Sequence, residues 1–167
     1  IWRTQATTYY ANNTQYTISW YAKAAETTTM QVFQGAALSG GGNNLTGNYD
    51  LVNVVATKIT GNANAAFGIL PVGGGWNRCW ATFTTHDITS TGQLQIRILD
   101  SSNTASFLGN GVDGFHIWGY QINTGNTPGP YVVTSGAAVS SISGIGLDTS
   151  QKGLNSFVPV NMDIGST

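Results

Sequence analysis

The sequence contains few charged residues and a single cysteine. Only 8% of its 167 residues are charged, and six basic against seven acidic residues leave a formal net charge of −1. A chain without a basic excess has no electrostatic footprint for nucleic acid or an anionic membrane surface, so we expect neither partner. The single cysteine, Cys79, excludes an intrachain disulfide and a thiolate metal cluster. We expect Cys79 to be a small buried hydrophobic residue in a strand.

Long apolar runs and helical periodicity are also missing. No run of about 18 apolar residues occurs, and no basic-then-apolar leader opens the chain, so we expect neither a membrane span nor a signal peptide. Because the chain begins at Ile1, we interpret it as part of a longer or processed polypeptide. A helical period with caps at its ends never persists, which favours an all-β protein.

Patterns typical of catalysis and metal binding are absent as well. His86 and His116 have no neighbours at the spacing of a zinc site, and no G-x-S-x-G nucleophile motif occurs. Glu26 is the only glutamate, which leaves little choice for the carboxylate pair of a glycosidase. The glycines at 40–42 lack the Lys and Ser or Thr of a phosphate-binding loop. We therefore expect no catalytic residue, no metal, no cofactor and no enzymatic activity.

What the sequence does have is 22 glycines and recurrent stretches of aromatic and β-branched residues. These stretches return about every 10–14 residues, a spacing typical of a sandwich or jelly roll. The predicted strands are residues 2–10, 16–24, 30–34, 51–59, 67–72, 76–85, 93–100, 115–122 and 131–133. The first two are predicted to form a hairpin through the turn at 11–14, and residues 35–48 to form a glycine-rich loop. Pro71 is predicted to put its strand at a sheet edge or to end it.

Alternation assigns faces to two of these strands. In residues 16–24, Trp20 and its alternate neighbours are expected to face the core, and Tyr21 the other side. In residues 76–85, Trp76, Arg78 and Trp80 share one face, opposite Cys79 and its alternate neighbours. Gly119, inside the strand 115–122, is interpreted as a bulge or a close backbone contact.

The fold prediction is an all-β, two-sheet antiparallel β-sandwich of the jelly-roll type over residues 1–140. A chain of 167 residues fits one such domain. Residues 141–167, rich in Ser and Gly with scattered apolar side chains, are predicted to form an irregular C-terminal arm at a subunit interface.

Three blocks of sequence, in order, resemble a known family. Residues 16–24 (YTISWYAKA) are similar to its early Y-T-L-S-x-Y-x-K-A strand, and residues 75–78 (GWNR) to G-W-Y-R. Residues 118–123 (WGYQIN) and 131–134 (YVVT) match its closing W-G-A-Q-L-E and Y-I-P-T, with departures at Tyr120, Asn123 and Val133. Over about residues 1–140 the chain thus resembles the concanavalin-like, carbohydrate-binding-module-like jelly rolls of phage tail and head fibre proteins.

The resemblance implies a non-enzymatic virion structural protein of a phage. Such a fibre, decoration or tail-associated domain would act in attachment or shell reinforcement, with weak binding of host cell-surface glycan. The expected partners are other virion proteins and further copies of this chain, a trimer being preferred. The same fold also serves in carbohydrate-binding modules of secreted polysaccharide-degrading enzymes, so that function and a secreted location stay open as the alternative.

The candidate glycan-binding residues are Trp80, Arg78, Tyr21 and Trp76, bordered by the loop 35–48. Aromatic rings stack on the apolar faces of sugars, and polar side chains such as Arg satisfy the hydroxyl groups. The alternative for Trp76 and Trp80 is packing beneath a loop or at a subunit interface.

Overall fold

The structure is a computed structural model that describes residues 2–6, 10–35, 44–85, 92–100, 102–105 and 110–133. For residues 2–6 and 92–93 it describes the backbone only. Nearly all of these residues belong to one compact unit, Ile1–Tyr131. The predicted domain end near residue 140 and the predicted arm, 141–167, lie outside the described residues. The described residues contain no helix of the length and hydropathy needed to cross a membrane.

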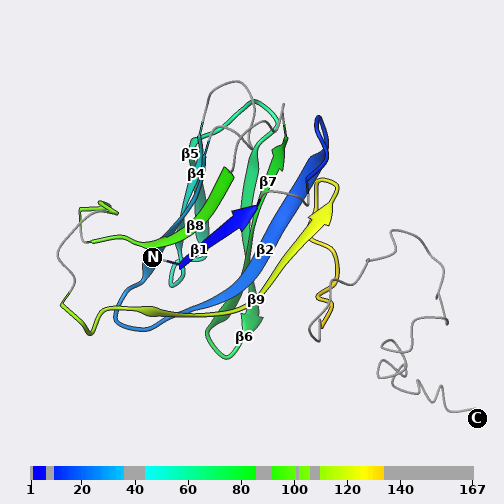
Figure 1. The fold of residues 1–167 in the computed structure, drawn as a ribbon. Helices are drawn as coiled ribbons and strands as arrows, with labels where there is room; N and C mark the ends of the chain where they lie inside the picture. The colour runs from blue at the N-terminus through cyan, green and yellow to red at the C-terminus, as the bar shows by residue number, and fades with distance from the viewer. Residues whose placement is uncertain are drawn as a thin grey trace, which may run out of the picture. The chain divides into compact units, whose positions relative to one another are not determined.

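The described residues form nine strands in two antiparallel sheets (Figure 1). Sheet A has the strand order β1-β8-β3-β4-β5 and sheet B the order β6-β7-β2-β9. The strands are β1 (Trp2–Ala6), β2 (Gln15–Ala24), β3 (Thr29–Gln34), β4 (Leu45–Asp50), β5 (Val55–Thr60), β6 (Ala66–Gly73), β7 (Trp76–Thr84), β8 (Gly92–Ile98) and β9 (Phe115–Thr124). The predicted all-β, two-sheet antiparallel sandwich is confirmed, whereas its jelly-roll connectivity stays a prediction.

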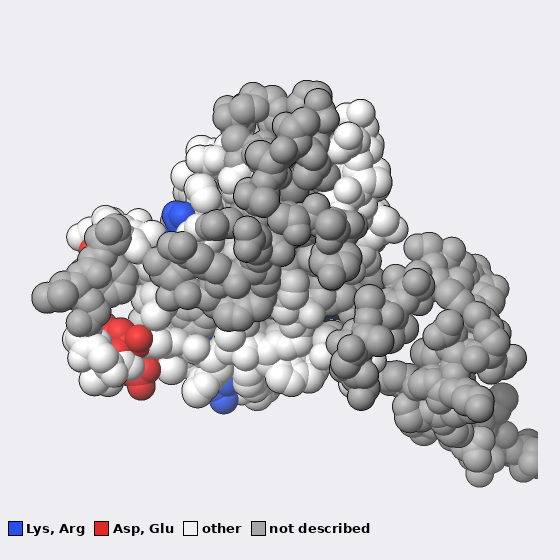
Figure 2. Space-filling view, in the orientation of Figure 1, with Lys and Arg blue, Asp and Glu red and all other residues white. Residues whose placement is uncertain are grey.

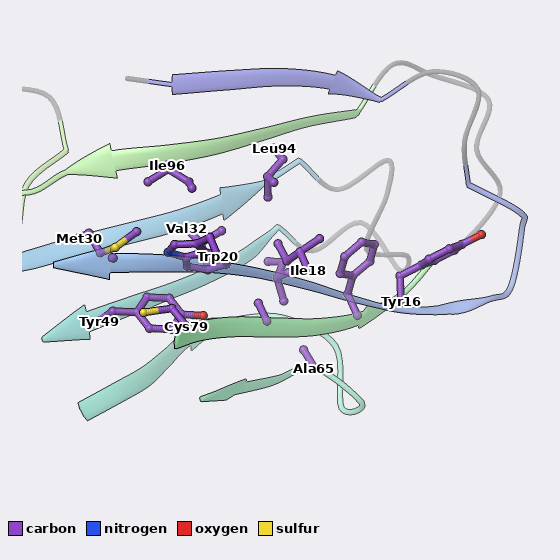
Figure 3. Close-up of a cluster of buried hydrophobic side chains, with 14 of the residues drawn as sticks. Tyr16, Ile18, Trp20, Met30, Val32, Tyr49, Ala65, Cys79, Leu94 and Ile96 are labelled. Carbon is purple, nitrogen blue, oxygen red and sulfur yellow. The ribbon is translucent and has the colours of Figure 1, made fainter. Parts of the chain in front are cut away.

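The core lies between the two sheets, where the alternate side chains of their strands meet (Figure 3). Trp20 of β2 is fully buried, and its ring meets that of Tyr49 of β4 edge-on, with centroids 5.2 Å apart. The Tyr49 hydroxyl donates a 2.6 Å hydrogen bond to the carbonyl oxygen of Trp80, so it ties sheet A to sheet B. Each such buried side chain contributes on the order of 2 kcal/mol.

Cys79 is buried in this core, as predicted. Its burial raises the pKa of the thiol, and burial also raises the pKa of the neighbouring Tyr49 hydroxyl. The faces predicted from alternation are confirmed: Ile18, Trp20 and Ala22 are buried, and β7 alternates between half-buried and buried positions over its first five residues. Pro71 lies in β6, an edge strand of sheet B, also as predicted.

The predicted hairpin of the first two strands is wrong. β1 pairs with β8 in sheet A, and β2 lies in sheet B. The turn before β2 is held by the end of β7 instead, because Thr14 and Thr85 exchange hydrogen bonds of 2.9 Å through their backbone and the Thr85 hydroxyl. The turn before β2 is thus anchored to β7 within sheet B.

Three segment boundaries also differ from the prediction. Residues 45–48, assigned to the loop 35–48, belong to β4, while residues 36–43 lie outside the described residues. Residues 51–54 form a turn rather than the start of a strand, because the Asp50 carboxylate accepts hydrogen bonds from the amides of Val52 and Asn53. Residues 131–133, predicted as a strand, do not form one.

Candidate functional site

The outer surface of sheet B carries aromatic and basic side chains on three adjacent strands. β2 lies between β9 and β7, so each of its outward residues has an outward neighbour on either side. We call the resulting patch the aromatic face; it has two rows across β9, β2 and β7, namely Trp118, Tyr21 and Arg78 in the first and His116, Lys23 and Trp76 in the second. Cross-strand neighbours of this kind have β-carbons about 5 Å apart.

A β-bulge in β9 places Trp118 on this face. Two residues of β9, Gly119 and Tyr120, stand opposite the single residue Trp20 of β2. Gly119 has φ +61°, a conformation that suits a glycine at the first position of such a bulge. Residues two apart in a regular strand share a face, but here Trp118 points outward while Tyr120 packs against the core. The predicted bulge at Gly119 is confirmed.

The aromatic side chains of the face form two groups of contacting rings, one of which includes Tyr131 of the segment after β9. The Trp118 ring lies 4.7 Å from the ring of Tyr21 and 4.8 Å from that of Tyr131, measured between centroids. Trp76 lies 6.3 Å from the imidazole of His116. Trp118 is nevertheless 53% exposed, so its ring is held by neighbours and still open to solvent.

A groove opens between these rings. Its volume is about 400 Å³, and it is lined by Tyr21, Val72, Gly73, Trp76 and Trp118. Its walls are mainly apolar and aromatic, a lining typical of sites that hold small organic ligands.

The chain after β9 folds back over the same sheet through residues 125–130. We call residues 125–131 the return segment. Its first residue, Gly125, donates a 2.9 Å hydrogen bond to the carbonyl of Gln15 and accepts one of 2.8 Å from the Thr17 hydroxyl. Further along, Gln121 and Asn123 of β9 bind the backbone of Pro130 and Gly129 at 2.8 and 3.0 Å.

Arg78 binds this return segment. Its guanidinium donates hydrogen bonds to the carbonyl of Gly129 and, at 3.2 Å, to the hydroxyl of Ser19. Its Cζ atom also lies 5.7 Å from the centroid of the Tyr21 ring, within reach of a cation–π interaction. Arg78 therefore holds Gly129 while its guanidinium lies over Tyr21, and it does not line the groove.

Trp80 is not among the residues that line the groove. A β-carbon at Gly68 would fall 2.0 Å from Cζ2 of Trp80, so the indole covers the bare backbone of the edge strand β6. Trp80 is half-buried. Its contact with β6 favours the alternative that Trp80 packs against the protein over the prediction that it binds a ligand. Of the four candidate residues, the structure brings Tyr21 and Trp76 together in the groove and sets Trp80 and Arg78 aside.

Trp118 was not among the residues expected at the site. Plain alternation cannot place it, because the bulge at Gly119 changes which face the residues before it occupy. The loop 35–48 was expected to border the site, but its described end is part of β4 in sheet A. His86 lies outside the described residues.

The arrangement, exposed aromatic rings around an apolar groove, suits the binding of a small ligand. In the described ranges no three His, Cys, Asp or Glu side chains gather as a metal site would require. No protein-family model matches the chain, and no curated protein matches it. The resemblance of three sequence blocks to phage jelly rolls therefore stays a hypothesis. What the structure establishes is the β-sandwich fold and the aromatic face.

Proposed function

We propose that this β-sandwich is a non-enzymatic glycan-binding domain that holds a saccharide in the groove of the aromatic face. The observation that carries the proposal is Trp118, a residue that is 53% exposed although its ring contacts the rings of Tyr21 and Tyr131. An exposed tryptophan is costly to leave in water, and an indole held in place offers a flat apolar surface to the C–H face of a sugar. Tyr21 and Trp76 extend that surface across β2 and β7.

Rigidity favours binding at this site. Because the rings of Tyr21, Trp118 and Tyr131 already contact one another, little side-chain entropy is left to lose when a ligand stacks on them. Stacking of one aromatic ring on a sugar contributes on the order of 1 kcal/mol, so each domain binds weakly. Several copies held together would raise the overall affinity through multivalency.

We further propose that the domain serves in a phage virion, as a fibre, decoration or tail-associated domain in attachment or shell reinforcement. The support is the resemblance of residues 16–24, 75–78, 118–123 and 131–134 to that family, together with the low charge of the chain. Assembly as a homo-oligomer, with a trimer preferred, supplies the multivalency. The competing proposal, a carbohydrate-binding module of a secreted enzyme, predicts a catalytic domain encoded beside this one rather than capsid, portal or tail proteins.

A glycan array tests the binding proposal. Wild-type chain is compared with Trp118→Ala and with Ile59→Ala, which removes a side chain of matching exposure, 52%, from β5 in sheet A. We expect Trp118→Ala to lose the glycans that wild type and Ile59→Ala both retain. Identical array profiles for all three proteins would reject the groove as a glycan site.

A further inference from the structure

The aromatic face carries charge of one sign. The chain as a whole has a net charge of −1 and few charged side chains. Few of the described residues visible in Figure 2 are charged. The described outward positions of β2, β7 and β9, and the return segment, hold Lys23, Arg78 and His116 and no Asp or Glu. A locally basic face on a weakly acidic protein indicates an anionic ligand.

Lys23 is the basic group that the fold leaves available. Arg78 is bound to Gly129 and Ser19, whereas Lys23 makes no hydrogen bond or ion pair with any described residue. Its aliphatic stem runs along the backbone of Gly75, where a β-carbon would lie 3.3 Å from the Lys23 Cε. The stem is thus supported by protein, and a lysine whose stem packs in this way commonly keeps its ammonium group in water.

The register places Lys23 between two rings of the same row. On β7 its neighbour is Trp76, which lines the groove, and on β9 its neighbour is His116, whose ring nitrogens can donate hydrogen bonds. The row lies two residues, or about 7 Å, from the row of Tyr21 and Trp118. A sugar stacked on Trp118 therefore extends its ring substituents toward Lys23 and His116.

Two exposed carboxylates limit where an anion can sit. Glu26 and Asp113 lie in the turns beyond this row, and the turns are joined by a 2.9 Å hydrogen bond from the Thr27 amide to the Gly114 carbonyl. Both repel an anionic group placed past the row. The favourable position for a carboxylate is consequently between the two rows, above Lys23.

We propose that the groove selects saccharides that bear a carboxylate, of the hexuronic or sialic acid type, with Lys23 and His116 as the residues that determine this specificity. The inference rests on the proposed glycan binding and names its ligand class. The sugar ring stacks on Trp118, and its carboxylate accepts charge-assisted hydrogen bonds from the Lys23 ammonium and the His116 imidazole. An exposed ion pair of this kind gives a preference of roughly fivefold, which salt weakens.

Matched pairs of probes isolate the charge. Trigalacturonic acid is compared with its methyl ester, and 3′-sialyllactose with the methyl ester of its sialic acid, in NMR titrations of the full chain at low salt. Each pair has the same rings and differs in the carboxylate alone. We expect wild type to bind the acid of at least one pair about fivefold more tightly than the ester, and to lose that preference in molar salt.

Four variants separate the preference from binding itself. Lys23→Gln should bind acid and ester alike, and His116→Gln, which leaves the ammonium in place, should keep only part of the preference. Lys23→Arg, which keeps the charge, should retain the preference. Trp118→Ala should weaken the binding of all probes. Equal affinity of wild type for acid and ester, with Trp118→Ala still weakening both, would overturn the acid selectivity and leave glycan binding standing. If wild type binds neither pair, the selectivity is rejected, and a glycan array on which wild type also binds nothing rejects glycan binding.

Discussion

Gly119 of β9 lies against the ring of Tyr21 on β2: a β-carbon at position 119 would approach Tyr21 Cδ2 to 2.9 Å. The same β-carbon would lie 3.2 Å from Cε2 of Tyr131. The two tyrosines can flank Trp118 because the backbone between them carries no side chain. Gly119 thus shapes the aromatic face as well as the strand, because its missing side chain leaves room for the two tyrosine rings.

Replacing Gly119 with alanine should therefore destabilise the domain. The substitution places a β-carbon on a residue with φ +61° and against two rings, and we expect the free energy of unfolding to fall by about 2 kcal/mol in urea denaturation. Gly114→Ala is the matched control, because a β-carbon there meets no atom within 4 Å. Equal stability of the two variants would contradict this role for Gly119.

At Val54, by contrast, we expect a substitution to stabilise the domain. This β-branched residue, in the turn between β4 and β5, has φ +57°, a conformation that suits Asn or Gly far better. We expect Val54→Asn to raise the free energy of unfolding by about 1 kcal/mol and the midpoint of thermal unfolding with it. Val52→Asn, in the same turn without a positive φ, should change neither. A Val54→Asn protein that melts below wild type would show that the valine side chain contributes more than its backbone costs.

The Asp50 carboxylate should make this turn sensitive to acid. It accepts hydrogen bonds from the amide and side chain of Asn53 and from the amide of Val52, and these bonds lower the pKa of Asp50. A lowered folded-state pKa means that the stabilisation is present at neutral pH and is lost as pH falls through the titration of the carboxyl group. We expect Asp50→Ala to be less stable than wild type at pH 7, with the difference shrinking toward pH 3. A difference that is constant between those pH values would contradict this account.

Arg78 should secure the return segment. Arg78→Met keeps most of the stem but removes the hydrogen bonds to Gly129 and Ser19, leaving the Gly129 carbonyl without its donor. We expect a loss of about 2 kcal/mol in unfolding free energy and faster hydrogen exchange of the Gly129 amide, which donates to Asn123. Unchanged exchange at Gly129 would assign Arg78 a role elsewhere.

Local patterns were enough to predict the faces of β2 and β7. Alternation depends only on the pleat of a strand, so Cys79 could be placed in the core and Arg78 outside without knowledge of any partner. The same rule showed that Trp76 and Tyr21 face outward. Only strand pairing could show that these two residues lie on adjacent rows of one face.

What the sequence could not predict depended on distant contacts. Arg78 meets Gly129 across 51 positions of the chain, so its commitment to the return segment leaves no local pattern. β1 could not be assigned to β8 for the same reason, since the turn at 12–13 is compatible with a hairpin. Trp118 was missed although the bulge at Gly119 was foreseen, because a bulge reverses the faces of the residues before it.

The central claim is that a saccharide binds over Trp118 and Trp76, and the indole N–H signals of the protein test it most directly. In a titration of ¹⁵N-labelled chain with the best glycan from the array, we expect the indole signals of Trp118 and Trp76 to shift. Those of Trp20, which is fully buried, and of Trp80, which covers Gly68, should stay in place. Shifts confined to Trp80, or binding that leaves the Trp118 and Trp76 signals unmoved, would contradict the account.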